Sequence, residues 1–294
     1  MKVLVIGSSG QLATSLIERA HGRVDIELSV IGRPEVDLEV PGSVTSAIAA
    51  AAPEVVINAA AYTAVDQAED EPKRAFRINA EAVGEIAAAT AGNARLIHIS
   101  TDYVFDGRAE GAYLENAETN PLNVYGRSKL AGEANVSSAN PEHLIVRTSW
   151  VYSPFGRNFV ATMMGAAERN DSLTVVDDQR GCPTSALDLA DGLLRIIEKW
   201  SEGNGTGLGE TYHLAGTGST SWCGFAQSIM DERRAHGLNA AVVAPIQTED
   251  WPTRAERPRN STLDSGKFLR DFGFAVPEWR SSLIEVVGRL AKAA

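Results

Sequence analysis

The chain of 294 residues is 44% hydrophobic, which allows a sizeable core and one large domain or two medium ones. Its formal net charge of -11 argues against a protein that mainly holds nucleic-acid phosphates, although a local basic pocket for one small anion is compatible with it. Two cysteines, Cys182 and Cys223, are too few for a disulfide framework or a zinc ribbon, and no apolar run approaches the ~20 residues of a membrane span. We expect a cytoplasmic protein without a nucleic-acid or membrane partner.

The N-terminal stretch indicates a nucleotide site. Val3 to Ile6 is a continuous apolar run, typical of a strand buried on both faces of a parallel sheet and not of a signal peptide. A glycine turn with Gly7, Gly10, Gln11 and Leu12 follows, and apolar residues at helical spacing come next. The amides of such a turn and the N-terminus of its helix hold a pyrophosphate. The spacing G-x-x-G-x-x-A differs from the commonest dinucleotide fingerprint, and a bare structural turn is the alternative.

The end of the second predicted strand, near Ile26 to Ile31, bears on the cofactor. An acidic residue at this place grips the 2′-hydroxyl of NAD, but the sequence has Gly32-Arg33-Pro34. An arginine accommodates a 2′-phosphate, so NADPH is favoured and NADH is the second choice; alternatively, Arg33 is only a surface charge. Asp37 and Leu38 fit a loop that borders the adenine.

The next predicted strand, Val55 to Asn58, runs into Ala59, Ala60, Ala61 and Tyr62. Small residues at a strand end let the backbone come close to a ligand. A helix is predicted over 68–91, with Pro72 starting or bending it. Asn79 lies there among apolar neighbours and needs partners, either to tie loops together or to support the site.

The predicted strand Leu96 to Ile99 leads into Ser100, Thr101, Asp102 and Tyr103. Open α/β sheets place their ligands at the carboxyl ends of strands, so these polar groups belong to a candidate site. Pro121 disfavours helix in the residue before it, and a helix is expected to start a few residues later. Tyr125 and Lys129 are one turn apart on that helix and share a face. An ammonium there lowers the pKa of the phenol, which makes the pair suitable for acid–base work at a carbonyl.

Strand and helix alternate less regularly after Trp150, with helices expected near 159–169, 185–200 and 222–236 and strands near 173–176 and 211–215. The predicted fold is α/β: a Rossmann-type doubly wound parallel sheet with a smaller, discontinuous α+β substrate domain. We assign 1–150 and about 173–215 to the NADP(H)-binding domain, and about 151–172 and 216–294 to the substrate domain. The arginine cluster of Arg254, Arg257 and Arg259 suits a diphosphate, with Arg254 and Arg257 as the expected substrate-binding residues; a solvated basic loop is the alternative.

These motifs together resemble the extended short-chain dehydrogenases/reductases that act on nucleotide sugars, and most closely the dTDP-4-dehydrorhamnose reductase family. The match covers nearly the whole length in order. Its main segments are Gly7–Leu12, Asn58–Asp66, Ile78–Ala80, Ser100–Gly107, Pro121–Glu133, Arg147–Tyr152, Asp178–Thr184 and Arg257–Ser261.

The resemblance implies roles for these residues. Thr101, Tyr125 and Lys129 match the catalytic hydroxyl, the acid and the lysine that holds the nicotinamide ribose. Asp102, Tyr103 and Trp150 match positions near the sugar, while the glycine turn and Ala59 to Tyr62 match the two halves of the cofactor site. The implied reaction is NADPH-dependent reduction of the 4-keto group of dTDP-4-dehydro-β-L-rhamnose to dTDP-L-rhamnose.

The chain departs from that pattern at one place. Related reductases can bridge a dimer through a magnesium ion held by glutamates, but the corresponding positions here are Ser15 and one near Leu187. We therefore expect no metal and a monomer, with a dimer through another surface as the alternative. Two rival functions stay open: reduction of another dTDP-4-keto-6-deoxyhexose, and a non-catalytic regulatory relative of the fold.

Overall fold

The computed structural model describes residues 1–293 and is built on a parallel sheet. Six strands lie in the order β10-β5-β4-β3-β1-β2, and every neighbouring pair is parallel. Their bounds are β1 (Lys2–Ile6), β2 (Glu27–Ile31), β3 (Val55–Asn58), β4 (Arg95–Thr101), β5 (His143–Thr148) and β10 (Glu210–His213). This order confirms the predicted Rossmann-type sheet.

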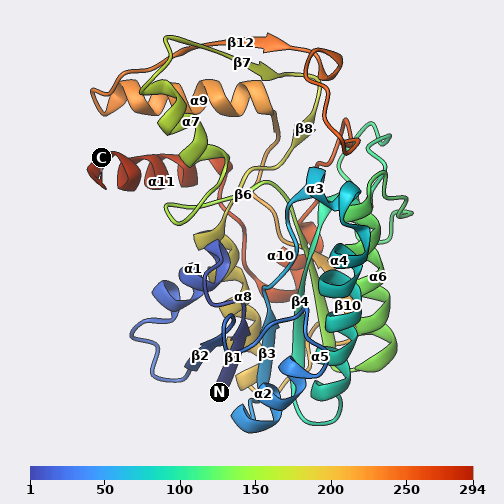
Figure 1. The fold of residues 1–294 in the computed structure, drawn as a ribbon. Coiled ribbons are helices and arrows are strands. Elements are labelled where there is room, and N and C mark those ends of the chain that lie inside the picture. The colour runs from blue at the N-terminus through green and yellow to red at the C-terminus, as the bar shows by residue number, and fades with distance from the viewer. Residues whose placement is uncertain (294) are drawn as a thin grey trace.

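Helices cover both faces of the sheet, because its strands alternate buried apolar side chains between two cores. On one face, Val3 and Val55 pack with α1 (Gln11–Ala20), α8 (Ala186–Ser201) and α10 (Gly266–Phe272). On the other face, Leu4 and Val56 pack with α2 (Ser43–Ala51), α5 (Ala82–Thr90) and α6 (Val124–Ala139). Figure 1 shows these two helical layers on either side of the strands.

The chain between β3 and α5 is less regular than the single helix expected over 68–91. It forms α3 (Val65–Asp70), α4 (Pro72–Phe76) and a π-helical turn, η1 (Arg77–Glu81), before α5 begins. Pro72 begins α4, where its missing N–H costs no helical hydrogen bond. The wider turn η1 contains Asn79, which is fully buried. Asn79 thereby reaches the interior between α6 and the segment after β3.

A second part lies over the carboxyl edge of the sheet (Figure 1). Its core joins α7 (Phe159–Ala167), α9 (Trp222–Ala235) and α11 (Trp279–Ala293). Short strands complete it: β6 (Val151–Tyr152) pairs with β9 (Thr184–Ser185), and β8 (Arg180–Gly181) pairs with β11 (Thr220–Ser221). A 3₁₀ turn, η2 (Asp102–Val104), follows β4, and a second one, η3 (Thr248–Asp250), follows β12 (Val242–Ile246).

The expected division of the chain needs a correction at two segments. The strand β7 (Ser172–Val176) pairs with β12 and packs on α9, and so it does not join the cofactor-binding sheet. Conversely, α10 lies in the expected substrate domain but packs Phe268 and Phe272 into the core of the sheet. β7 lies outside the sheet because it pairs with a strand distant in the sequence. α10 packs on the sheet because its two phenylalanines are buried in that core. We propose that 1–150, about 185–215 and α10 form the cofactor-binding part.

Within the described residues, no helix is both long enough and apolar enough to cross a membrane.

Candidate active site

Thr101, Tyr125 and Lys129 come together where β4 meets α6. Thr101 is the last residue of β4, and Tyr125 lies in the first turn of α6. The Thr101 hydroxyl is hydrogen-bonded to the Tyr125 phenol and lowers the pKa of that phenol. The Lys129 ammonium is buried and donates to the carbonyl oxygen of Ile99 at 2.6 Å. The three residues that sequence reasoning selected therefore share one place at the carboxyl edge of the sheet.

Two contacts define the start of α6 and its close approach to the turn after β4. The side-chain oxygen of Asn123 accepts from the Gly126 amide at 2.8 Å and caps the helix. A Cβ at Gly126 would stand 2.2 Å from the Tyr103 carbonyl oxygen, so only glycine permits this close approach. The rings of Tyr103 and Tyr125 then meet edge to face at 5.6 Å. The turn after β4 and the first turn of α6 thus hold the phenol between them.

The charges of this site differ from expectation in one respect. Burial raises the pKa of Tyr125 to about 12, with a further contribution from Asp102, and only the Thr101 hydroxyl lowers it. Lys129 does not act on the phenol here, because its ammonium is held by Ile99. Burial also lowers the pKa of Lys129 to about 8, against the opposing charge of Glu133. The expected lowering of the phenol pKa by Lys129 is therefore absent from this arrangement.

Asp102 and Tyr103, which were expected near the sugar, flank the same hydroxyl. Asp102 is 2% exposed, and its Oδ1 accepts a hydrogen bond from Thr101 at 3.0 Å. Burial raises the pKa of Asp102 to about 7. The Tyr103 amide donates to the Thr101 hydroxyl oxygen at 3.2 Å, and burial raises the pKa of the Tyr103 phenol.

The glycine turn after β1 fits a dinucleotide. Gly7 has a φ of 117°, and a Cβ there would lie 3.1 Å from the Ala60 amide nitrogen, so the turn packs closely against the segment after β3. Gly10 precedes α1 as its N-cap, and no side chain of residues 1–293 caps this helix. Apart from Gly10 itself and its neighbours along the chain, no heavy atom of the described residues lies within 4 Å of the position of a Gly10 Cβ. Uncapped amides beside open space are what a pyrophosphate requires.

The side chains of Gln11 and Leu12 face the protein. Gln11 accepts from the Ser153 hydroxyl at 2.8 Å and so joins α1 to the loop after β6. The Leu12 side chain is buried in the core between the sheet and the helices α1, α8 and α10. We propose that these two residues contribute their backbone amides to the cofactor site.

The segment Ala59 to Tyr62 is held from behind by Asn79. The Asn79 side chain accepts from the Tyr62 amide at 2.8 Å and donates to the Tyr62 carbonyl at 3.0 Å and to the Ser128 hydroxyl at 2.9 Å. These hydrogen bonds use both the oxygen and the nitrogen of the Asn79 amide, and so they supply the partners that a buried amide needs. We propose that Asn79 positions Tyr62 and α6 and does not contact the cofactor itself.

The residues expected around the adenine half lie in the loop after β2. Arg33 is exposed, and within residues 1–293 it forms no ion pair with a carboxylate, so its guanidinium is free to meet a phosphate. The Asp37 carboxylate accepts from the Glu39 amide at 2.9 Å and serves the loop. Leu38 is buried in the core on the α2 side. Only the backbone of Asp37 and Leu38 is therefore proposed to border the adenine.

Trp150 follows β5 in the left-handed region, with a φ of 46°. Its ring stacks on Trp222 with centroids 3.5 Å apart and planes 6° from parallel. A Cβ at Gly181 would stand 2.4 Å from the Trp150 ring, so Gly181 is the residue that this contact requires. A backbone conformation that is unusual for a large side chain is a known mark of functional positions. We propose that Trp150 forms a wall of the sugar site.

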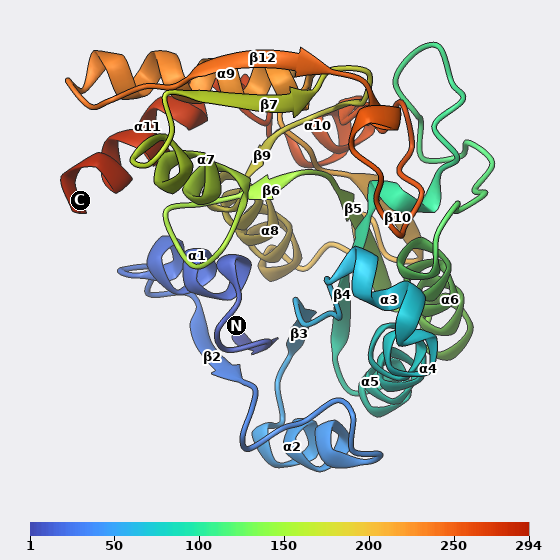
Figure 2. The same ribbon diagram turned by 45° about the horizontal axis from the view of Figure 1, so that its top comes forward.

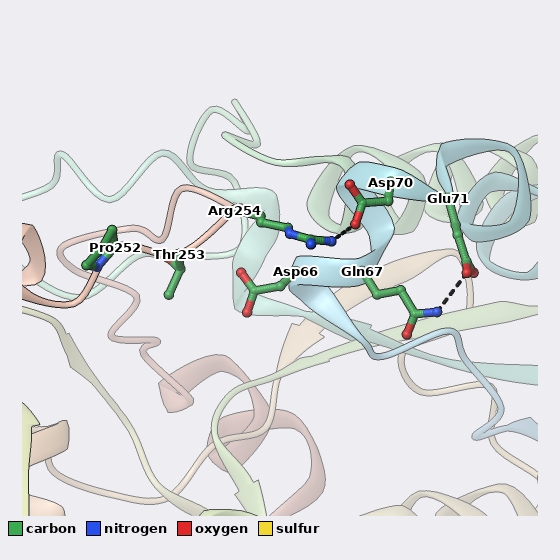
Figure 3. Close-up of a pocket in the computed structure, with 7 residues that line it drawn as sticks. All are labelled: Asp66, Gln67, Asp70, Glu71, Pro252, Thr253 and Arg254. Atoms are coloured by element: carbon green, nitrogen blue, oxygen red, sulfur yellow. Dashed lines mark hydrogen bonds and ion pairs between the residues drawn. The ribbon is translucent and has the colours of Figure 1, made fainter.

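Arg254 and Arg257 do not stand free for a diphosphate. Arg257 donates to both carboxylate oxygens of Asp66, at 3.1 and 2.7 Å. Arg254 pairs with Asp70 in a pocket that α3 shares with the segment after η3 (Figures 2 and 3). The lining residues of this pocket are Asp66, Gln67, Asp70, Glu71, Pro252, Thr253 and Arg254. Carboxylates of α3, roughly 190 residues earlier in the chain, thus pair with both guanidinium groups, and composition alone does not reveal this pairing.

A second pocket carries two further cations: Arg259, which belongs to the arginine cluster of residues 254–259, and Arg180, to which the sequence analysis gave no role. Arg180 and Arg259 line it, and in the described chain neither is paired with a carboxylate. Asn123 is a further omission, since it caps α6 and also donates to the Glu256 carbonyl at 2.8 Å. The sequence did contain a signal for Arg180 and Asn123, because these residues lie inside the segments 178–184 and 121–133 that carried the resemblance.

Among residues 1–293, no three or more histidine, cysteine, aspartate or glutamate side chains form a group that could hold a metal ion.

A parallel doubly wound sheet with a glycine turn after its first strand, and a Thr–Tyr–Lys set at its carboxyl edge, defines a nicotinamide-dependent oxidoreductase of the short-chain dehydrogenase/reductase class. The model of one family within this class, described as RmlD substrate binding domain, matches residues 1–292. The chain belongs to this family.

Individual relatives agree over nearly their whole length. A dTDP-4-dehydrorhamnose reductase of Sinorhizobium fredii is 44% identical, with 99% of this chain and 98% of the relative covered. The crystal structure of a dTDP-4-dehydrorhamnose reductase of Clostridium acetobutylicum superposes with a TM-score of 0.90 at 37% identity, covering 99% of both chains. A dTDP-4-dehydrorhamnose reductase of Bacillus anthracis, solved in complex with NADP, has a TM-score of 0.89 at 35% identity and covers 97% of this chain and 98% of its own.

Proposed function

We propose that the protein reduces the 4-keto group of dTDP-4-dehydro-β-L-rhamnose to dTDP-L-rhamnose with NADPH. The observation that carries this proposal is the joint placement of Thr101, Tyr125 and Lys129 at the carboxyl edge of the parallel sheet, the edge at which the glycine turn follows β1. The full-length similarity to reductases of this name, one of them solved with NADP, supports the substrate and the cofactor.

The chain's own residues divide the work in the following way. When bound, NADPH would supply the hydride; the amides after Gly7 and Gly10 would hold its pyrophosphate, and Arg33 would hold its 2′-phosphate. Tyr125 donates a proton to the oxygen that becomes negative as the carbonyl is reduced. Thr101 gives a second hydrogen bond to the same oxygen. The Lys129 ammonium, which the Ile99 carbonyl holds at the end of β4, would bind the ribose.

The experiment is to mix the purified protein with NADPH and a panel of dTDP-4-keto-6-deoxy sugars and to follow the loss of NADPH absorbance. The 4-dehydrorhamnose compound is expected to turn over fastest, with dTDP-L-rhamnose as product. Faster turnover of another sugar in the panel would favour the alternative reductase. Binding of NADPH without turnover of any sugar would favour a regulatory relative.

We propose further that the protein acts as a monomer in the cytoplasm. Ser15 stands where related reductases place one metal-binding glutamate, and Leu187 lies near the position of another; both residues are buried and offer no carboxylate. Light scattering with and without a chelator tests this point, and a chelator-sensitive dimer would contradict it.

A further inference from the structure

The Thr101 hydroxyl has more potential acceptors than it has protons. It accepts from the Tyr103 amide at 3.2 Å and donates to Asp102 Oδ1 at 3.0 Å. It also lies in hydrogen-bonding position to the Tyr125 phenol. Yet a threonine hydroxyl carries a single proton and two lone pairs. If that proton goes to Asp102, none is left for a carbonyl oxygen of the substrate.

The Asp102 carboxyl is unusual in its surroundings. Its side chain is 2% exposed, and Oδ2 is buried without a hydrogen-bond partner in the described chain. An ionised carboxylate is costly in such a place, because burial disfavours the charged form and one oxygen has no donor. A protonated carboxyl is less costly, and its O–H can donate to a neighbouring hydroxyl oxygen.

We propose that Asp102 is a positioning residue whose protonation directs the Thr101 hydroxyl. When Asp102 is protonated, it donates to the Thr101 oxygen, and the threonine proton is then free to hydrogen-bond the sugar carbonyl. When Asp102 is ionised, it attracts the threonine proton through a stronger, charge-assisted bond. Thr101 then presents only lone pairs to the carbonyl and cannot stabilise its developing charge. This inference rests on the proposed reductase function.

The groups facing Asp102 come from several segments. Tyr103 is its neighbour in the chain, Tyr125 faces it from α6, and Cys182 and Ser261 face it from two loops. The charged groups of Arg257 and Asp66 are further from Asp102 and face Tyr103. Burial outweighs the nearby hydroxyls of Ser261 and Thr101 and raises the pKa of Asp102 to about 7. The protonated form therefore predominates below neutral pH, and reduction is expected to slow as pH rises through that pKa.

The test is the pH profile of kcat in the parent and in Asp102→Asn, with NADPH and the best substrate of the panel. The amide of the variant donates to Thr101 at every pH. The kcat of the parent is expected to fall about tenfold between pH 6 and pH 8, because one pH unit above the pKa only about a tenth of Asp102 remains protonated. In Asp102→Asn the fall should begin about one unit higher, where Lys129, with a pKa of about 8, loses its proton.

Two controls separate this idea from a structural role. Asp106→Asn removes a nearby carboxylate that accepts from Tyr113 and from the Arg108 amide, away from Thr101. Its profile should match that of the parent. In Thr101→Ala the fall of kcat between pH 6 and pH 8 should disappear, whereas Thr101→Ser should retain it. These two variants test the inference even where Asp102→Asn does not fold.

An unchanged midpoint in Asp102→Asn, or the same profile in Thr101→Ala and Thr101→Ser, would overturn the inference while leaving the reductase function intact. Absence of turnover in the parent would instead contradict the proposed function.

Discussion

Lys129 Nζ donates to the carbonyl oxygen of Ile99 at 2.6 Å, two residues before Thr101 on the same strand. This bond fastens α6 to β4 and keeps a buried ammonium hydrogen-bonded, as buried polar groups require. Nearby, Glu133 on the same helix accepts from Arg147 of β5 at 2.9 and 2.7 Å. The helix that carries Tyr125 is thus tied by charged groups to two neighbouring strands, β4 and β5, and the phenol is placed by a rigid support.

Replacement of Tyr125 by phenylalanine should remove the proton donor while leaving the fold intact. Turnover is expected to fall by about 10²–10⁴-fold, the usual contribution of a positioned general acid. NADPH binding, followed by fluorescence titration, should change little. Tyr212→Phe is the matched control, because Tyr212 lies on the edge strand β10 and its hydroxyl donates to Asp271. Parental turnover in Tyr125→Phe would show that the catalytic assignment is wrong.

Arg33 should decide the preference between the two nicotinamide cofactors. Because a charge-assisted bond to phosphate contributes roughly 1.5–3 kcal/mol and Arg33 is exposed, Arg33→Ala is expected to reduce kcat/KM for NADPH by about tenfold. The value for NADH, which lacks the 2′-phosphate, should stay close to that of the parent. Arg169→Ala, an exposed arginine just beyond α7, should alter neither value. An equal loss with both cofactors would contradict a role at the 2′-phosphate.

Arg257 and Arg254 should contribute unequally to the attachment of the segment after η3. Arg257 forms a two-pronged, partly buried pair with Asp66, and Arg257→Ala is expected to lower the free energy of unfolding by about 1–2 kcal/mol. Arg254 is 67% exposed and paired with an exposed Asp70, so Arg254→Ala should cost less than about 1 kcal/mol.

Limited proteolysis gives a second measure of the same attachment. Cleavage within 247–257 should accelerate in Arg257→Ala and much less in Arg254→Ala. Equal effects of the two variants would show that geometry and burial do not distinguish these pairs.

The buried His213 should make the protein less stable as the pH falls. Burial lowers the pKa of His213 to about 3, from its usual value of 6.5. The unfolded chain therefore takes up a proton below pH 6.5 that the folded chain refuses until about pH 3. Stability from this residue is complete above pH 6.5 and decreases below it, by about 1.4 kcal/mol per pH unit.

In His213→Asn, which retains a donor for the Tyr113 carbonyl, the free energy of unfolding should depend less on pH between 5 and 6.5. Urea titrations over this range measure the difference from the parent, and that difference isolates His213 because Asp102 contributes equally to both proteins. His21→Asn, at an exposed histidine, should behave as the parent does. An identical slope in His213→Asn and the parent would contradict a neutral buried imidazole.

Local pattern determined much of this protein. The buried strand before Gly7, the strand that ends at Thr101, and the shared helical face of Tyr125 and Lys129 follow from periodicity and turn chemistry within a few residues. The family resemblance added the roles. Only the tertiary structure decided which distant groups meet. Arg257 pairs with Asp66, Lys129 donates to the Ile99 carbonyl, and β7 pairs with β12. Burial and ion pairing depend on segments far apart in the chain, whose approach is set by packing of the whole core, and no local pattern encodes them.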